Sequence, residues 1–208
     1  MKTLLVLLVI FSATTVFGQD TTPAQTPKPP EPASLSKAES GPATPKLSAA
    51  EKYFSDVELI DQDGTKLRFY NDVLKNKIVV INTFFTTCTN ICPPMNRNFE
   101  KMQEALGDRL GKDVFLVSIT VDPATDTPPR LKEYSRRFHA RAGWLFLTGK
   151  KENVDWALYK LGQYVETRDD HTNIFIIGNE PKGLWKKAFG LAKADELIRI
   201  MEDVINDR

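Results

Sequence analysis

The stretch that decides the fold runs from Ile78 to Met95 and reads IVVINTFFTTCTNICPPM. Its first eight residues are almost all β-branched or aromatic, which is the pattern of a strand buried on both faces of a sheet. Two cysteines follow, Cys88 and Cys92, and two prolines stand directly after the second. Proline is common in the first turn of a helix. The stretch therefore predicts a buried strand, a loop with two cysteines and the start of a helix.

The segment after the cysteines continues that helix. Large apolar residues recur there at intervals of four, three and four, which places them on one face of a helix that ends at Gly107: Met95, Phe99, Met102 and Leu106. This spacing favours a place for Met95 in the hydrophobic core over a role at a metal site, although its thioether would also be a soft contact for a metal.

Strand and helix signals alternate through the rest of the chain. Two short apolar runs, 57–60 and 67–70, flank a turn-forming group and predict a β-hairpin. The remaining predicted strands are 114–121, 144–147, 171–177 and 184–189, and the remaining predicted helices are 126–138, 154–161 and 193–205. Such alternation is typical of an α/β protein with helices on both faces of a mainly parallel sheet. The order resembles a thioredoxin-like fold, with a central mixed sheet flanked by helices and an extra N-terminal β-hairpin.

The N-terminal residues differ from this pattern. Residues 1–18 combine a positive charge at Lys2, an apolar run over 4–11 and a small-residue exit, which together are typical of a secretory signal peptide. An uncleaved membrane anchor is the alternative. Residues 19–50 hold seven of the thirteen prolines and no aromatic residue, so they predict a disordered Pro-rich tether. The folded domain is expected to span 51–208, in the periplasm or another extracytoplasmic compartment with a membrane nearby.

Composition narrows the class of function. The chain carries 28 Lys and Arg against 27 Asp and Glu, a net charge of +1 that offers no basic field to a nucleic-acid backbone. Its 208 residues are 41% hydrophobic, enough for one domain with its own core, so the two cysteines are not needed as a staple. We expect a monomer without a nucleic-acid partner.

The spacing of the cysteines leaves several uses open. Cys88 and Cys92 are separated by three residues at a predicted helix start, where free N–H groups and the helix dipole favour thiolates. Thiolates serve either thiol–disulfide exchange or metal binding, and the spacing alone does not decide between them. A structural disulfide or two inert buried thiols is the simplest alternative.

A metal held by two thiolates needs a third ligand, and imidazole beside thiolates suits copper or zinc. The chain has two histidines. His139 ends a helix rich in Lys and Arg and is expected to face solvent at that helix's C-terminus. His171 opens the predicted strand 171–177, and in a thioredoxin-like layout this position lies opposite the cysteine loop. A loop histidine without a ligand role is the alternative for His171.

Four motifs in sequence order resemble the Sco/SenC family and together cover nearly all of the predicted domain: FFTTCTNICP at 84–93, SITVDPATDTP at 118–128, WLFLTG at 144–149 and DHT at 170–172. The resemblance implies a thioredoxin-like protein, outside the cytoplasmic membrane or in mitochondria, that serves assembly of the dinuclear copper centre of cytochrome c oxidase. It implies copper ligands at Cys88, Cys92 and His171. The implied partner is the copper-site subunit of that oxidase or another copper acceptor. Members commonly carry Pro-Asp after the first cysteine, whereas this chain has Thr89-Asn90, so a negative charge beside the metal is missing.

The leading hypothesis is an exported protein that binds Cu(I) or Cu(II) through these three ligands and delivers it. Its rival is an enzyme, a thiol–disulfide reductase that uses Cys88 and Cys92 as a redox-active pair to keep a partner's copper-site cysteines reduced, without need of His171. A third hypothesis is a binding module with an oxidised structural pair. A fourth is a peroxidase with a threonine-rich pocket at Thr86 and Thr87.

Four aspartates complete the predicted site. Asp169 or Asp170 is expected to orient His171 by bonding its second ring nitrogen, as metal-binding histidines require. Asp122 and Asp126 follow a predicted strand and are expected near the site, in turn-forming and helix-capping roles.

Overall fold

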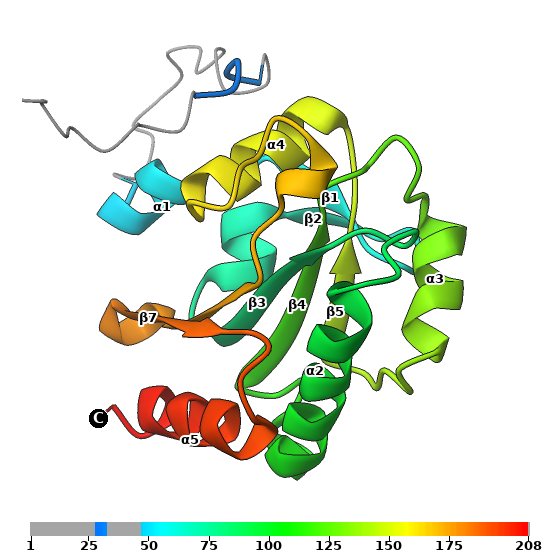
Figure 1. Cartoon of the computed structure of the whole chain (residues 1–208). Helices are drawn as coiled ribbons and strands as arrows, with labels where there is room; N and C mark the ends of the chain where they lie inside the picture. Colours follow the sequence, from blue (N-terminus) through cyan, green and yellow to red (C-terminus); the bar gives the residue numbers. More distant parts are fainter. Residues whose placement is uncertain (1–27, 33–46, 208) are drawn as a thin grey trace, which may run out of the picture.

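The computed structural model describes residues 28–32 and 47–207. Its centre is a five-stranded sheet with the order β5-β4-β3-β6-β7 (Figure 1). The strands are β3 (Ile78–Phe84), β4 (Val114–Thr120), β5 (Trp144–Leu147), β6 (Ile174–Asn179) and β7 (Leu184–Phe189). β3, β4 and β5 run parallel, whereas β6 is antiparallel to both β3 and β7. This confirms the predicted mixed sheet with its antiparallel pair at one side.

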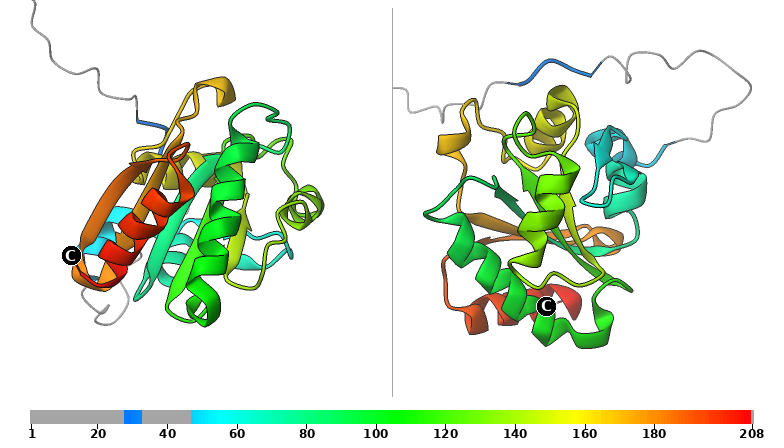
Figure 2. Two further views of the ribbon diagram at one scale, coloured as in Figure 1. Left: turned by 60° about the horizontal axis from the view of Figure 1, so that its bottom comes forward. Right: turned by 90° about the vertical axis from the view of Figure 1, so that its right-hand side faces the viewer.

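Helices cover both faces of the sheet. On one face lie α2 (Cys92–Leu106) and α5 (Ala194–Ile205), with α3 (Pro128–Arg136) beside β5 (Figures 1 and 2). On the other lie α1 (Ala49–Phe54), α4 (Lys151–Lys160) and a π-helical turn, η2 (Phe69–Leu74). Each face has its own buried apolar cluster, and Met95 belongs to the α2 side with no exposure. The arrangement is thioredoxin-like, as predicted.

The N-terminal hairpin differs in part from its prediction. β1 (Glu58–Ile60) and β2 (Lys66–Arg68) pair antiparallel, as expected. The second apolar run was predicted to continue as a strand through Tyr70, but Phe69 and Tyr70 begin η2 instead. The physical reason is burial: both rings pack against Phe54 of α1, at centroid distances of 6.2 and 6.3 Å. Alternation over so few residues does not separate a strand end from a helical turn.

The strand after His171 also starts later than predicted. Residues 168–170 form a 3-10 turn, η4 (Arg168–Asp170), and β6 begins only at Ile174. The Thr167 hydroxyl donates a 2.7 Å hydrogen bond to the Asp170 carboxylate and closes this turn. His171 therefore stands in extended backbone between the turn and the strand.

The N-terminal region is described only in short pieces. The predicted signal peptide or anchor, residues 1–18, lies outside the described residues, as does most of the predicted tether. Within the tether's range, α1 crosses the predicted domain boundary at residue 50, and Lys28 lies 4.8 Å from the ring centre of Trp156. Among the described residues, no helix combines the length and apolar character needed to span a bilayer.

Strand directions place the functional loops together. The cysteine loop follows the end of β3, and the loop with Asp122 and Asp126 follows the end of the parallel strand β4. Because β6 is antiparallel to β3, the residues that precede β6 lie at the same edge. The Thr83 hydroxyl donates a 3.3 Å hydrogen bond to the Thr172 carbonyl across this edge. The topology thus brings His171 to the cysteine loop.

Candidate metal centre

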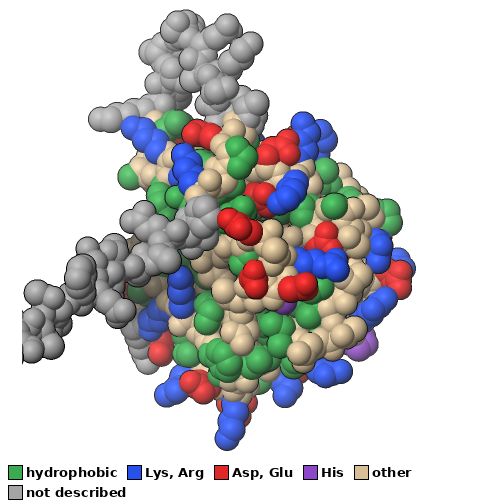
Figure 3. Space-filling view, turned by 45° about the horizontal axis from the view of Figure 1, so that its top comes forward, with side chains coloured by type: hydrophobic (Ala, Val, Ile, Leu, Met, Phe, Trp, Pro, Cys, Tyr) green, Lys and Arg blue, Asp and Glu red, His purple; other side chains and the backbone are tan. Residues whose placement is uncertain are grey.

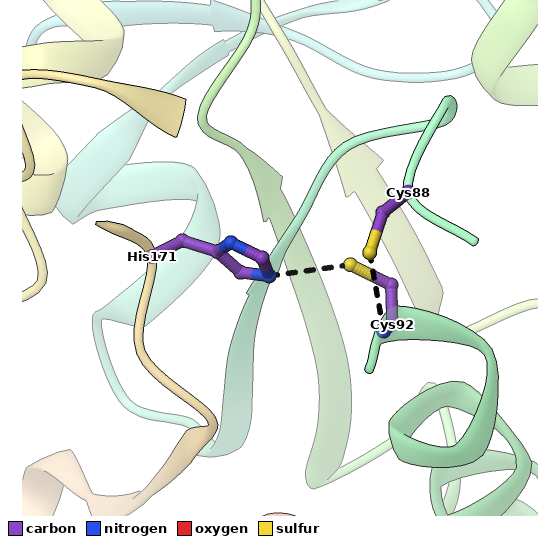
Figure 4. Close-up of side chains that lie close together, drawn as sticks. All are labelled: Cys88, Cys92 and His171. Atoms are coloured by element: carbon purple, nitrogen blue, oxygen red, sulfur yellow. Dashed lines mark hydrogen bonds between the residues drawn. The ribbon is translucent and has the colours of Figure 1, made fainter. Parts of the chain in front are cut away.

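Cys88, Cys92 and His171 form one cluster. Their ligand atoms all lie within 4.8 Å of one another, and Nε2 of His171 lies 3.4 Å from Sγ of Cys92. Figure 4 shows the imidazole reaching from its loop toward the two sulfurs, with Cys88 in the loop and Cys92 at the start of α2. The structure therefore brings together the three side chains that the sequence singled out.

A backbone carbonyl fixes the orientation of the His171 ring. Nδ1 lies 2.9 Å from the carbonyl oxygen of Arg168, which can only accept, so Nδ1 carries the hydrogen. In the neutral ring Nε2 then has a free lone pair, and it faces Cys92. The prediction that Asp169 or Asp170 fills this role is wrong, because the η4 turn directs the Arg168 carbonyl to the ring while the Asp170 carboxylate bonds Thr167.

Burial keeps the imidazole neutral. His171 is 8% exposed. Removal from water disfavours the charged ring and lowers the pKa of His171 below 6.5, although the Arg168 carbonyl opposes this shift. A neutral imidazole with Nε2 unprotonated is the form that binds a metal.

The two cysteines differ in acidity. Burial is the largest influence on Cys88 and would raise its pKa, but hydrogen bonds from Cys92 and from backbone N–H groups outweigh it and the pKa of Cys88 falls. One of these donors is the N–H of Cys92, 3.4 Å from Sγ of Cys88. Cys92 is fully buried, which raises the pKa of its thiol strongly. The helix N-terminus thus favours a thiolate at Cys88 and not at Cys92, whereas the sequence predicted this effect for both.

Cys88 is open to approach from two sides. The side chain is half-buried and lines two cavities of about 430 Å³ each. His171 and Arg168 line the first cavity, and Arg97 and Phe138 line the second. Because the side chain is half-buried and lines both cavities, a group from another molecule can reach the Cys88 sulfur. Figure 3 shows acidic and basic side chains intermixed over one face of the molecule.

The cluster fits a small soft metal ion. Bonds of about 2.3 Å to sulfur and about 2.0 Å to nitrogen put two ligand atoms of one ion about 3.5 to 4 Å apart. The 3.4 Å between Cys92 Sγ and His171 Nε2 is close to that range, and the cluster's 4.8 Å limit requires only a small contraction. Two sulfurs and one imidazole are donors for copper or zinc and not for calcium or magnesium.

Asp126 anchors the cysteine loop. It is fully buried and accepts hydrogen bonds from the Thr86 backbone N–H at 3.1 Å and from the hydroxyls of Thr86 and Thr120 at 2.5 Å each. The predicted helix-capping role is wrong, because Thr127 occupies the N-cap of α3 and Asp126 turns inward to the loop before Cys88. Thr86 lines a cavity with Cys88, but it donates its hydroxyl hydrogen to this carboxylate, so that hydrogen is not available to a peroxide.

Asp122 anchors the opposite side of the site. Its carboxylate pairs with the Arg168 guanidinium at 2.5 Å, and the Arg168 guanidinium also lies 5.2 Å from the ring centre of Phe85. Phe85 in turn meets the His171 ring edge to face, at 5.2 Å. The sequence placed Asp122 near the site, but nothing in it pointed to Arg168, because Asp122 and Phe85 lie far from it along the chain.

His139 lies outside this cluster. Its side chain is 81% exposed and pairs with Glu100 at 2.6 Å. This agrees with the predicted solvent-facing position after α3.

Comparison with known proteins gives a family match. The sequence profile described as SCO1/SenC matches residues 45–206. An SCO2-like protein of Rickettsia conorii is 38% identical over 103 residues, 50% of this chain, and the match covers only 48% of that relative, about half its length. A Stutzerimonas stutzeri protein named as a candidate copper-binding protein is 29% identical over 171 residues, covering 77% of this chain and 81% of the relative. The structure of Arabidopsis thaliana ScoI with copper bound shares the fold, with a TM-score of 0.61, 24% identity, and coverage of 75% of this chain and 99% of that one.

Proposed function

The chain belongs to the SCO1/SenC family, and from that premise we propose that it binds one copper ion between Cys88, Cys92 and His171 and passes it to a copper-accepting protein. The observation that carries the proposal is the unprotonated Nε2 of His171, held 3.4 Å from Cys92 Sγ by the Arg168 carbonyl on the far side of the ring. A histidine at a strand edge without a ligand role has no need of this orientation.

The ligand set suits both binding and release. Thiolates hold Cu(I), and an imidazole beside them also accepts Cu(II). Three protein ligands leave the coordination shell incomplete, and the cavities beside Cys88 admit a ligand from a partner. Copper then passes by ligand exchange, in which each bond to an incoming ligand replaces one to this chain. No free ion needs to enter solution.

The partner and the compartment form the outer part of the proposal. We propose that the acceptor is the dinuclear copper centre of cytochrome c oxidase, in the periplasm or an equivalent compartment. The family resemblance supports the acceptor, and the signal-like residues 1–18 support export. Copper binding by the Arabidopsis protein and the description of the Stutzerimonas protein support copper as the cargo.

The test compares the two histidines of one chain. The full chain, reduced without oxygen, is titrated with Cu(I) against a chromophoric chelator and with Cu(II) while the thiolate-to-copper absorption band is recorded. We expect one copper per chain, a loss of about tenfold or more in affinity for His171→Ala, and no change for His139→Ala, the exposed histidine. Equal copper affinity in all three proteins would overturn the proposal.

A thiol–disulfide reductase is the second candidate, because the acidity of the two thiols differs as such an enzyme requires. The accessible Cys88 has the lowered pKa and the buried Cys92 the raised one. In this reaction the Cys88 thiolate attacks a partner disulfide and releases one partner thiolate. Cys92 then loses its proton to that thiolate and attacks Cys88, which releases the second. Two electrons pass to the partner, and an external dithiol must reduce the new Cys88–Cys92 disulfide.

Exchange kinetics separate the two candidates. A reductase predicts rapid reduction of a disulfide-linked peptide of the acceptor's copper site, with the rate unchanged in His171→Ala. It also predicts a trapped mixed disulfide at Cys88 in Cys92→Ser. Slow exchange together with tight copper binding supports the carrier.

A further inference from the structure

Three of the contacts of Arg168 bear on the position of His171. Its guanidinium pairs with Asp122 at 2.5 Å and lies over Phe85 at 5.2 Å. Its backbone carbonyl accepts the Nδ1 hydrogen of the imidazole at 2.9 Å. One residue therefore both orients the ring and ties the ring's loop to other elements.

The partner of Arg168 is itself firmly held. The Asp122 side chain is 13% exposed, and its backbone N–H donates to the Thr120 hydroxyl at 2.9 Å. The same hydroxyl donates to Asp126, which accepts from Thr86 in the cysteine loop. A continuous path of hydrogen bonds and one ion pair thus runs from the cysteine loop, through the loop after β4, to the histidine loop.

Other ties to the η4 turn are scarce. Apart from those of the Arg168 side chain, its hydrogen bonds join Thr167 to Asp170 and the Arg168 carbonyl to His171, so they are internal to this short segment. Among the described residues, the hydrogen bonds and ion pairs that join the turn to another element come from the Arg168 side chain. Without that side chain, the turn would keep its internal bonds but would be held in place only from the C-terminal side of His171, where Thr172 bonds Thr83.

We infer that Arg168 and Asp122 are positioning residues, a latch that holds the His171 imidazole against the two sulfurs. The inference rests on the proposed function: with the latch closed, copper would have three ligands, and with it open, only the two cysteines. With the latch closed, Nε2 faces Cys92. With it open, the turn before His171 loses its tie to the loop after β4, while Thr172 stays bonded to Thr83 and Asp126 still holds the cysteine loop.

A matched pair of arginines provides the test. Arg168 and Arg109 are each 45% exposed and each pairs with an aspartate at 2.5 Å, but Arg109 lies after α2 and pairs with Asp113. Arg168→Met and Arg109→Met remove the charge and keep an apolar stem. Asp122→Asn opens the latch from its other side, and far-ultraviolet circular dichroism verifies that each variant folds.

The first readout needs no copper. In metal-free protein, ¹⁵N spectra of the His171 ring report a single tautomer with hydrogen on Nδ1. We expect Arg168→Met and Asp122→Asn to give averaged tautomers, while Arg109→Met retains the wild-type signals. A wild-type His171 signal in Arg168→Met would overturn the latch, whatever copper does.

The second readout measures the consequence for binding. We expect Arg168→Met to lose roughly tenfold to hundredfold in Cu(II) affinity and to lose nitrogen couplings in the electron paramagnetic resonance spectrum. The double variant with His171→Ala should bind no more weakly than His171→Ala alone, because the latch acts through that ring. Additive losses would overturn the latch. Failure of the proposed function is a different result, in which His171→Ala itself binds copper as the wild type does.

Discussion

Asp126 accepts hydrogen bonds from both the backbone N–H and the hydroxyl of Thr86, which stands two residues before Cys88. A carboxylate offers only acceptors, and the groups around it are donors: one N–H and two hydroxyls. The buried charge is therefore stabilised by donors that also fix the cysteine loop. Because the hydroxyl of Thr120 at the end of β4 is among these donors, the position of the cysteine loop is set by the sheet.

Replacement of this carboxylate by an amide should destabilise the protein. Asp126→Asn turns an –NH₂ group toward donors and leaves hydrogen bonds unmade in a fully buried site, so we expect a loss of about 1–3 kcal/mol in the free energy of unfolding. Urea denaturation checks this, with Asp113→Asn as the control because that side chain is 51% exposed. An unchanged midpoint in Asp126→Asn would show that the carboxylate does not hold the loop.

Alkylation should separate the two cysteines. Cys88 is half-buried with a lowered pKa, while Cys92 is fully buried with a raised one. Only the thiolate reacts, so the rate at Cys88 should rise with pH and reach its midpoint at a lower pH than that of an ordinary cysteine thiol. Iodoacetamide labelling of metal-free protein, followed by peptide mass spectrometry, measures both sites. Equal rates at the two cysteines, or faster labelling of Cys92, would contradict the prediction.

The sequence predicted the main elements well because their signals are local. The β-branched run at 78–85 and the spacing of the α2 residues each report burial within a few positions, and both elements lie close to their predicted bounds. The end of β2 was misplaced because strand and helical turn look alike over two buried aromatic residues.

The grouping of Cys88, Cys92 and His171 was predictable from the sequence, whereas the hydrogen-bond and ion-pair partners that position them were not. Cysteine and histidine carry their chemistry in their identity, and the family motif supplied their association. The partner of His171 Nδ1 is a backbone carbonyl, which every residue has, so side-chain identity gave no signal for Arg168. The roles of Asp122 and Asp126 depend on partners 46 and 40 positions away, and such pairing exists only once the sheet has formed.

Acid should weaken the metal-free fold through His171. The folded-state pKa of this ring lies below 6.5 because of burial, so the unfolded chain binds more protons once the pH falls under that value. The stabilisation is therefore complete above about pH 6.5 and is lost as the pH falls toward the folded-state pKa. We expect the free energy of unfolding to fall more steeply between pH 7 and pH 5 in the wild type than in His171→Asn. Parallel pH profiles from urea denaturation would contradict this.

Gly143 should tolerate no side chain, because two backbones meet there. Its φ is +98°, and an added Cβ would lie 2.4 Å from the backbone nitrogen of Gly111. The Gly143 carbonyl also accepts the Leu116 N–H at 2.9 Å, so a shift would pull β5 away from β4. We expect Gly143→Ala to cost at least about 2 kcal/mol in the free energy of unfolding, since backbone strain and a clash that flexible side chains cannot relieve act together.

A second glycine separates the effect of backbone strain from the effect of the steric clash. Gly183 also has a positive φ, +64°, but a Cβ there would meet no atom within 4 Å. Gly183→Ala should therefore cost only the left-handed backbone penalty of about 1–2 kcal/mol. Thermal and urea denaturation of the two variants measure the difference. Equal losses would mean that the approach of Gly143 to Gly111 is not as tight as the structure places it, and that β5 can shift without cost.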